Sequence, residues 1–342
     1  MANFRLVFSA VKFHSASFVV AVLFAALTLI SNLQAQPLLT IDTVTVGDAG
    51  NAADTTGYGA VAYDFNIGKY EVTIGQYTSF LNAVAATDTY SLYNPRMATD
   101  LNIAGITQAG SSGSFSYSAL GSGSRPISYV SWFDAARFAN WMQNGANAGA
   151  STETGAYTLN GASSGVNFTK NAGATWWIPS EDEWVKAAYY KGGSTNAGYW
   201  LYPTQSDTAP GNTIGGDANQ ANYRGISSVY SVTQSASYSS TQNYLTDAGA
   251  FSNSASAIGT FDQAGNVYEW NDAVIDSARG LRGGGWEGND TPVLRSSFRA
   301  GNVPTDEDNS IGFRLSTVPE PSTYALLAIT AAGALWMARR RR

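Results

Sequence analysis

Apolar residues recur at helical spacing directly after Thr73, which predicts an amphipathic helix beginning there; they are Tyr77, Phe80, Leu81 and Val84. Two further helices are predicted where a serine is followed three residues later by an acidic residue. Ser131 precedes Asp134 in this way, and Ser180 precedes Glu183. Such pairs satisfy the free amide groups at a helix start. The chain therefore contains at least three short helices.

Strand patterns are fewer. Leu39–Val46 alternates like an edge strand, and Ala60–Val72 also predicts a strand. Residues 87–125 predict a loop, residues 144–175 are rich in Gly, Ala and Ser and predict a hairpin insertion, and residues 192–260 predict little regular structure. A few helices, few strands and long ordered loops are typical of an irregular α+β domain. No internal repeat is evident, and about 280 mature residues could form one large domain or two small ones. Because the motifs described below run through the whole span, we expect a single domain over residues 37–317.

The first 36 residues have the pattern of a signal peptide. Arg5 and Lys12 give a basic start, Ala16–Ile30 is apolar, and Leu33–Ala35 ends on a small residue before the expected cut. The alternative is a membrane-anchoring helix. The apolar run is about fifteen residues, shorter than the ~20 that span a bilayer.

The last residues, 318–342, have three parts in order. Pro319-Glu320-Pro321 breaks any incoming structure, Tyr324–Ala338 is apolar, and Arg339–Arg342 is a basic cluster. The arginines place the end of a short transmembrane helix on the cytoplasmic side. This order resembles the PEP-CTERM sorting signal. The resemblance implies recognition and cleavage by an exosortase, with the chain only transiently in the inner membrane and then extracellular or on the cell surface. The alternative is a permanent anchor.

Composition excludes several kinds of chemistry. The chain has no cysteine, and its one histidine, His14, lies in the predicted signal peptide. Zinc or copper sites built on thiolate and imidazole are therefore excluded from the mature domain, as are Ser-His-Asp and Cys-His nucleophiles. The remaining carboxylates and backbone carbonyls suit hard cations such as calcium.

Charge excludes a further class of partner. Without the two terminal segments the domain has 13 basic and 24 acidic residues, a net charge near −11. A net-negative domain without a basic cluster argues against nucleic acid and against anionic membrane surfaces.

Residues 265–314 contain the most specific motifs. They include GNVYEW (265–270), RGGGW (282–286), an arginine-rich segment around Arg295 and Arg299, and GFR (312–314). Three upstream blocks come before them in the chain: GKYEVT with QY (68–77), PISYVSWFDAARFANW (126–141) and IPSEDEW (178–184). This ordered set resembles the formylglycine-generating enzyme family, also called the sulfatase-modifying factor family. The resemblance implies a variant of the C-type-lectin fold.

Glu269 is the first candidate metal ligand. It follows a turn whose carbonyls come from Ala264, Gly265 and Val267. One carboxylate with convergent backbone carbonyls is an arrangement that holds calcium, and the resemblance implies a structural calcium ion at these positions. The alternative is a buried Glu269 paired with an arginine such as Arg282 or Arg299.

Asn222 and Tyr223 resemble the family's second calcium site. That site also needs an acidic residue about a dozen positions later, and Ser227–Asn243 contains none. This departure places the second site in doubt.

The family's activity, oxidation of a substrate cysteine to formylglycine, depends on two cysteines that hold copper. Counted back from the GFR motif, their places fall at about Thr291 and Ser296. A hydroxyl is not a ligand for Cu(I), so we expect no copper. The sequence predicts an exported, surface-sorted binding or structural module of the cell envelope or matrix. The alternative is an oxidoreductase with a non-thiol metal site.

Aromatic and charged residues suggest where a glycan or protein ligand would bind. Five tryptophans in the recognised blocks are expected in the core: Trp132, Trp141, Trp184, Trp270 and Trp286. Three others, with the loop tyrosines, are candidates for surface contacts: Trp176, Trp177 and Trp200. Arg295, Arg299 and Arg314 lie near the acidic residues 306–308 in sequence, which favours a structural ion-pair network over a polar ligand groove.

Overall fold

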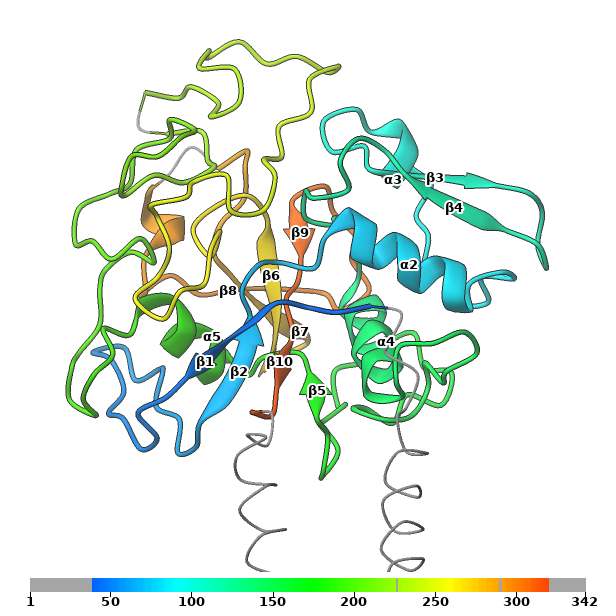
Figure 1. Ribbon diagram of the computed structural model, residues 1–342, viewed down its shortest axis with the longest axis horizontal. Helices are drawn as coiled ribbons and strands as arrows, with labels where there is room; N and C mark the ends of the chain where they lie inside the picture. The colour runs from blue at the N-terminus through cyan, green and yellow to red at the C-terminus, as the bar shows by residue number, and fades with distance from the viewer. Residues whose placement is uncertain (1–38, 226, 289–290, 320–342) are drawn as a thin grey trace, which may run out of the picture. The chain divides into compact units, whose positions relative to one another are not determined.

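A computed structural model describes residues 39–319, except 226 and 289–290 (Figure 1). The predicted signal peptide and the sorting tail from Glu320 onward lie outside these residues. Within the described ranges, no helix is both long and apolar enough to cross a membrane. The predicted transmembrane helix at 324–338 belongs to the part that is not described.

The three predicted helices are present. They are α2 (Ile74–Val84), α4 (Trp132–Gln143) and α5 (Glu181–Tyr189), and each begins with a complete capping box. In α4 the side chain of Ser131 accepts from the amide of Asp134, and the Asp134 carboxylate accepts from the amide of Ser131. The start positions were therefore predicted correctly. A fourth helix, α3 (Arg96–Thr99), is a single turn.

The first sheet has the order β1-β2-β10-β5. β1 (Thr43–Val46) is the predicted edge strand, whereas β2 (Phe65–Gly68) covers only part of the predicted Ala60–Val72. The two-residue strands β10 (Ser316–Thr317) and β5 (Trp176–Trp177) complete it. β10 pairs with both β2 and β5, so the end of the described chain lies between strands from much earlier in the sequence.

A second four-stranded sheet was not predicted. It has the order β8-β7-β6-β9, built from β6 (Tyr268–Ile275), β7 (Ala278–Arg282), β8 (Ala300–Asn302) and β9 (Ile311–Gly312). The stretch 265–314 has no alternating pattern because both faces of β6 are buried at Glu269, Trp270 and Asn271, which are each 0% exposed. Without alternation, sequence periodicity gives no strand signal.

The loop prediction for residues 87–125 and the hairpin prediction for residues 144–175 were both wrong. Residues 87–125 contain α3 and a hairpin, β3 (Ile106–Ala109) with β4 (Ser116–Ala119). Tyr117 anchors this hairpin, because its hydroxyl donates to the carbonyl of Ala85 and its amide donates to Asn82. Conversely, the described residues 144–175 contain no hairpin strands. There the backbone is held by side chains, such as Asn144, which donates to the carbonyls of Ser151 and Thr154.

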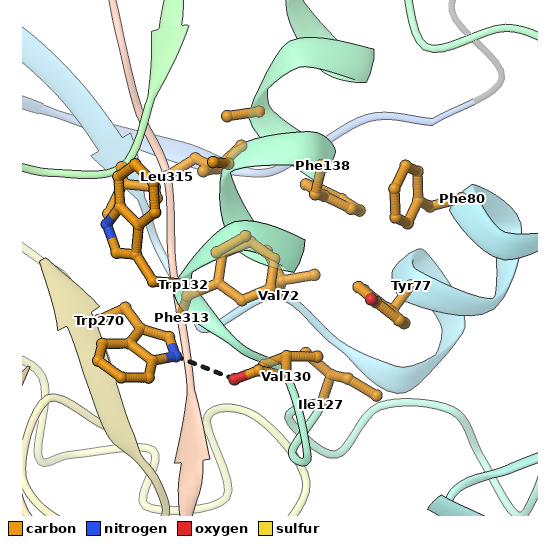
Figure 2. Packing of buried hydrophobic residues seen from close by; sticks show 14 of the residues in the cluster. Val72, Tyr77, Phe80, Ile127, Val130, Trp132, Phe138, Trp270, Phe313 and Leu315 are labelled. Atoms are coloured by element: carbon orange, nitrogen blue, oxygen red, sulfur yellow. Dashed lines mark hydrogen bonds between the residues drawn. The ribbon is translucent and has the colours of Figure 1, made fainter. Parts of the chain in front are cut away.

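The core lies between α2, α4 and the strands. Phe80 and Phe138 pack edge to face at 5.2 Å between ring centroids, and Phe138 also packs edge to face against Phe313. Figure 2 shows Phe138 between Phe80 and Phe313. Trp270 of β6 donates its indole N–H to the carbonyl of Val130 at 2.9 Å. The five expected core tryptophans are each at most 3% exposed, but Trp177 is buried too, at 3%, contrary to its predicted surface role.

Candidate functional site

Glu269 is the second residue of β6, and its carboxylate is paired with a single arginine. Its carboxylate accepts from Arg314 Nε at 2.6 Å and Nη2 at 2.7 Å, and from the indole N–H of Trp184 at 2.7 Å. Both charged side chains are fully buried. The alternative of a buried Glu–Arg pair is therefore present, with Arg314 as the partner instead of the expected Arg282 or Arg299.

Arg282 and Arg299 bind another carboxylate. Both pair with Glu181, at the start of α5, with N–O distances of 2.7 and 2.9 Å. Arg295 donates to the hydroxyl of Tyr202 at 3.0 Å. The arginines thus tie distant segments together, as a structural network does, but their partners are not the acidic residues 306–308.

Two further carboxylates lie near the Glu269–Arg314 pair: that of Glu71, which is buried, and that of Asp262, which is half-buried. Burial raises the pKa of Glu71 well above its usual value, and the charges of Asp262 and Glu269 add to this effect. Burial also raises the pKa of Asp262 to about 6, against the opposing influence of hydrogen bonding and Arg314. Oε2 of Glu71 has no hydrogen-bond partner among the described residues. Burial therefore favours the protonated, neutral form of Glu71 and, to a lesser degree, of Asp262.

A calcium ion in this region would have to displace the protons that burial favours on Glu71 and Asp262. No three acidic side chains in the described chain gather closely enough to hold a metal on their own. An ion would need backbone carbonyls as well, such as those of Ala264, Gly265 and Val267, which calcium accepts as ligands. Asp262 and Glu71 were missed as candidates. An acidic residue only two positions before Ala264 was the available signal for Asp262.

The structure brings the two predicted calcium segments together. Asn222 and Gly265 form a parallel bridge, and the carbonyl of Asn222 accepts from the amide of Asn266 at 2.7 Å. The Asn222 side chain donates to the carbonyl of Tyr244 and to Oδ1 of Asn266, both at 2.9 Å. The carbonyl of Tyr223 already accepts from Asn212 and Ser231. An ion at Asn222 and Tyr223 would have to replace those donors.

Away from this buried region, a groove of about 320 Å³ opens at the surface. Its lining includes Asp54, Tyr199, Trp200, Asp207 and Ser296. Trp200, predicted as a surface residue, is half-buried. The loops on both sides are joined where the amide of Ala52 donates to the carbonyl of Thr195.

Ser296 is fixed at the edge of this groove. Its amide donates to the carbonyl of Leu201 at 3.0 Å, and its own carbonyl accepts from Arg282 at 2.7 Å. Thr291, the other predicted cysteine-equivalent position, begins the 3-10 helix η1 (Thr291–Leu294). A hydroxyl therefore occupies the groove where the resemblance implies a thiol.

Residues 43–318 match the family profile of the sulfatase-modifying factor enzyme 1-like domain. The chain belongs to this family. Its fold is the expected α+β, loop-rich domain of the formylglycine-generating-enzyme type. Residues 317–342 match the PEP-CTERM protein-sorting motif, which supports export and surface sorting and implies processing by exosortase-type machinery.

Several solved structures are similar to this family member. The crystal structure of CarF is 21% identical, with a TM-score of 0.48, over 83% of this chain and 100% of that chain. Treponema denticola variable protein 1 is 18% identical, with a TM-score of 0.48, over 84% and 98%. PvdO from Pseudomonas aeruginosa is 18% identical, with a TM-score of 0.41, over 82% and 93%. No curated protein matches the chain.

Proposed function

We propose that this family member is an exported binding module that has exchanged thiol oxidation for ligand binding in the groove at Trp200. The observation that carries the proposal is Ser296. It lies at one of the two positions that the family resemblance assigns to copper-binding cysteines, and it lines a groove of about 320 Å³. That volume is in the usual range for ligand pockets.

Hydrogen bonds hold the groove walls in place, so the groove is formed before a ligand binds. Tyr199 donates its hydroxyl to the carbonyl of Gly59 at 2.8 Å and accepts from Asn51 at 2.7 Å. Burial and the nearby charge of Asp54 raise the pKa of Tyr199, so its hydroxyl stays protonated. A pre-formed wall loses little conformational freedom when a ligand binds.

Calcium has a structural part in this proposal. Bound by Glu269 or Asp262 together with the carbonyls of Ala264, Gly265 and Val267, it would hold these segments together around Arg314. An exported domain without disulfides has few other means of added stability. The site at Asn222 and Tyr223 is the weaker candidate, since those groups already have hydrogen-bond partners.

The sorting motif supports a place for this binding module outside the inner membrane. After processing we expect the domain at the cell surface or in the extracellular matrix, where its ligand is an envelope glycan or protein. Its net charge near −11 makes nucleic acid an unsuitable partner.

Retention by envelope material tests the proposal. The purified protein is incubated with cell-envelope and matrix fractions, and the bound amount is compared with that of Trp200→Ala. We expect retention that Trp200→Ala lowers at least fivefold. Trp176→Ala is the matched control, because Trp176 is also half-buried but lies in β5, outside the groove. Equal retention of all three proteins would remove the groove from the function.

The alternative is an oxidoreductase with a carboxylate-bound metal, for which Glu71, Asp262 and Glu269 near Arg314 are the available ligands. It predicts stoichiometric iron or copper in the purified protein. It also predicts that Asp262→Asn removes that metal, while Trp200→Ala leaves it in place.

A further inference from the structure

The groove presents hydrogen-bond acceptors, and none of its lining residues is basic. Two of them are carboxylates, Asp54 and Asp207, which come from loops far apart in the sequence. The remaining polar lining includes the side-chain hydroxyls of Thr55 and Ser296. A ligand that only accepts hydrogen bonds would find poor complementarity here, whereas a donor would be bound well.

Each carboxylate has one oxygen engaged with its own segment. Oδ1 of Asp54 accepts from the amides of Thr56 and Tyr58 at 2.7 and 3.2 Å. Oδ1 of Asp207 accepts from the amide of Leu201 at 2.9 Å. Oδ2 of Asp54 is buried and has no hydrogen-bond partner among the described residues. A buried charged oxygen without a donor is costly, so a donor that reaches it from the groove gains more than an ordinary hydrogen bond.

The aromatic wall already holds a cation of the protein's own. The ammonium group of Lys191 lies 4.3 Å from the centroid of the Trp200 ring. Indole is the strongest of the aromatic partners for cations. The Lys191 ammonium already occupies a face of this ring and would repel a second cation there, so the ring offers a ligand apolar contact instead of charge attraction.

We propose that the groove binds a positively charged primary amine, with the ammonium group between Asp54 and Asp207 and the attached carbon chain along Trp200. This inference rests on the function proposed above and names the ligand class for the same groove. The net charge near −11 of the domain adds a long-range attraction for a cationic ligand. A lysine side chain of an envelope protein and a free polyamine share this chemistry.

Calorimetric titration of the purified protein tests the proposal with four probes. Nα-acetyl-lysine amide represents a peptide side chain, and cadaverine represents a free diamine. Nα-acetyl-norleucine amide lacks the charge, and maltotriose represents a neutral saccharide. We expect the two amines to bind at least tenfold more tightly than the two neutral probes, with affinity falling as salt is raised. Tighter binding of the acetylated lysine than of cadaverine would assign the source to a peptide.

Two variants locate the site. Asp54→Asn keeps Oδ1 as an acceptor for the turn, and Asp207→Asn does the same for Leu201. Each is expected to weaken amine binding at least tenfold with an unchanged melting temperature. Asp276→Asn, in the exposed β6–β7 turn, is the control and should bind like the unaltered protein.

The outcomes separate this inference from the proposed function. Equal affinity for lysine and norleucine probes, or undiminished amine binding in both variants, overturns the amine assignment. Saccharide binding that depends on Trp200 overturns it as well, yet leaves the binding function standing. Stoichiometric copper with oxidation of a cysteine peptide would overturn the binding function itself.

Discussion

Gly265 lies so close to Asn222 that no side chain fits between them. A Cβ atom on Gly265 would be 2.1 Å from the carbonyl oxygen of Asn222, and the φ angle of Gly265 is +81°. This contact joins the two segments predicted to hold calcium. It also explains why the GNVYEW motif begins with glycine, since an L side chain there meets both a strained backbone and a neighbouring chain.

Replacing Gly265 with alanine should therefore cost more than backbone strain alone. The left-handed conformation costs about 1–2 kcal/mol for a residue other than glycine. Gly193 is the matched control, with φ +83° and open space at the Cβ position. In urea unfolding, we expect Gly265→Ala to lose at least 2 kcal/mol more than Gly193→Ala, because the Asn222–Asn266 bond must break as well. Similar losses would mean that the contact is unimportant.

Calcium should stabilise the protein through the buried carboxylates. An ion that binds only the folded state adds about 2.7 kcal/mol at a hundredfold excess over Kd. We expect chelation to lower the melting temperature of the unaltered protein and of the control Asp276→Asn, but not of Glu269→Gln or Asp262→Asn. If all four proteins respond equally to chelation, calcium does not bind at Glu269 or Asp262.

Asp134 should make stability depend on pH. Burial, and secondarily the charge of Glu307, raise its pKa to about 8, against the opposing effects of Ser131 and Arg137. The unfolded chain loses this proton near pH 4, whereas the folded state keeps it. The stability from this group is therefore complete below about pH 4 and is lost as pH rises toward 8.

The isosteric change Asp134→Asn tests this directly, because its side-chain oxygen can still accept from Ser131. At pH 8 the variant should be more stable than the unaltered protein by about 1 kcal/mol or more, and the difference should vanish toward pH 4. Urea unfolding across this range measures it. If the free energy of unfolding changes with pH in the same way for both proteins, Asp134 is not the group that keeps its proton in the folded state.

Sorting should remove the tail. The described chain ends in the exposed residues Val318 and Pro319, just after β10, and the amide of Val318 donates to the carbonyl of Thr175 at 3.1 Å. We expect mass spectrometry of the mature surface form to yield no peptides beyond about Ser322. Peptides containing Trp336 in that form would instead indicate a permanent anchor.

Local signals in the sequence predicted the helices but not the second sheet. Thr73, Ser131 and Ser180 each satisfy a helix start with a partner three residues away, so the information is contained in a few neighbouring positions. β6 is different, because Glu269 is held there by Arg314, which is 45 residues away, and by Trp184, which is 85 residues away. A buried carboxylate in a strand depends on long-range pairing, which residue spacing does not reveal.

The residues of the candidate site also fall into those that the sequence could identify and those that it could not. Ser296 and Trp200 could be identified from motif spacing and residue type. The groove could not, since Asp54 and Asp207 reach it from loops that have no regular pattern. That Oε2 of Glu71 is buried without a hydrogen-bond partner among the described residues can likewise be recognised only from the structure.

The central claim is that binding has replaced thiol oxidation, and one measurement tests it most directly. The purified protein is loaded with Cu(I), dialysed, and incubated in air with a cysteine-containing peptide, and both the retained copper and the peptide mass are determined. Because Thr291 and Ser296 offer only hydroxyls, the account predicts no stoichiometric copper and an unconverted cysteine. One copper ion per protein together with formylglycine in the peptide would contradict it.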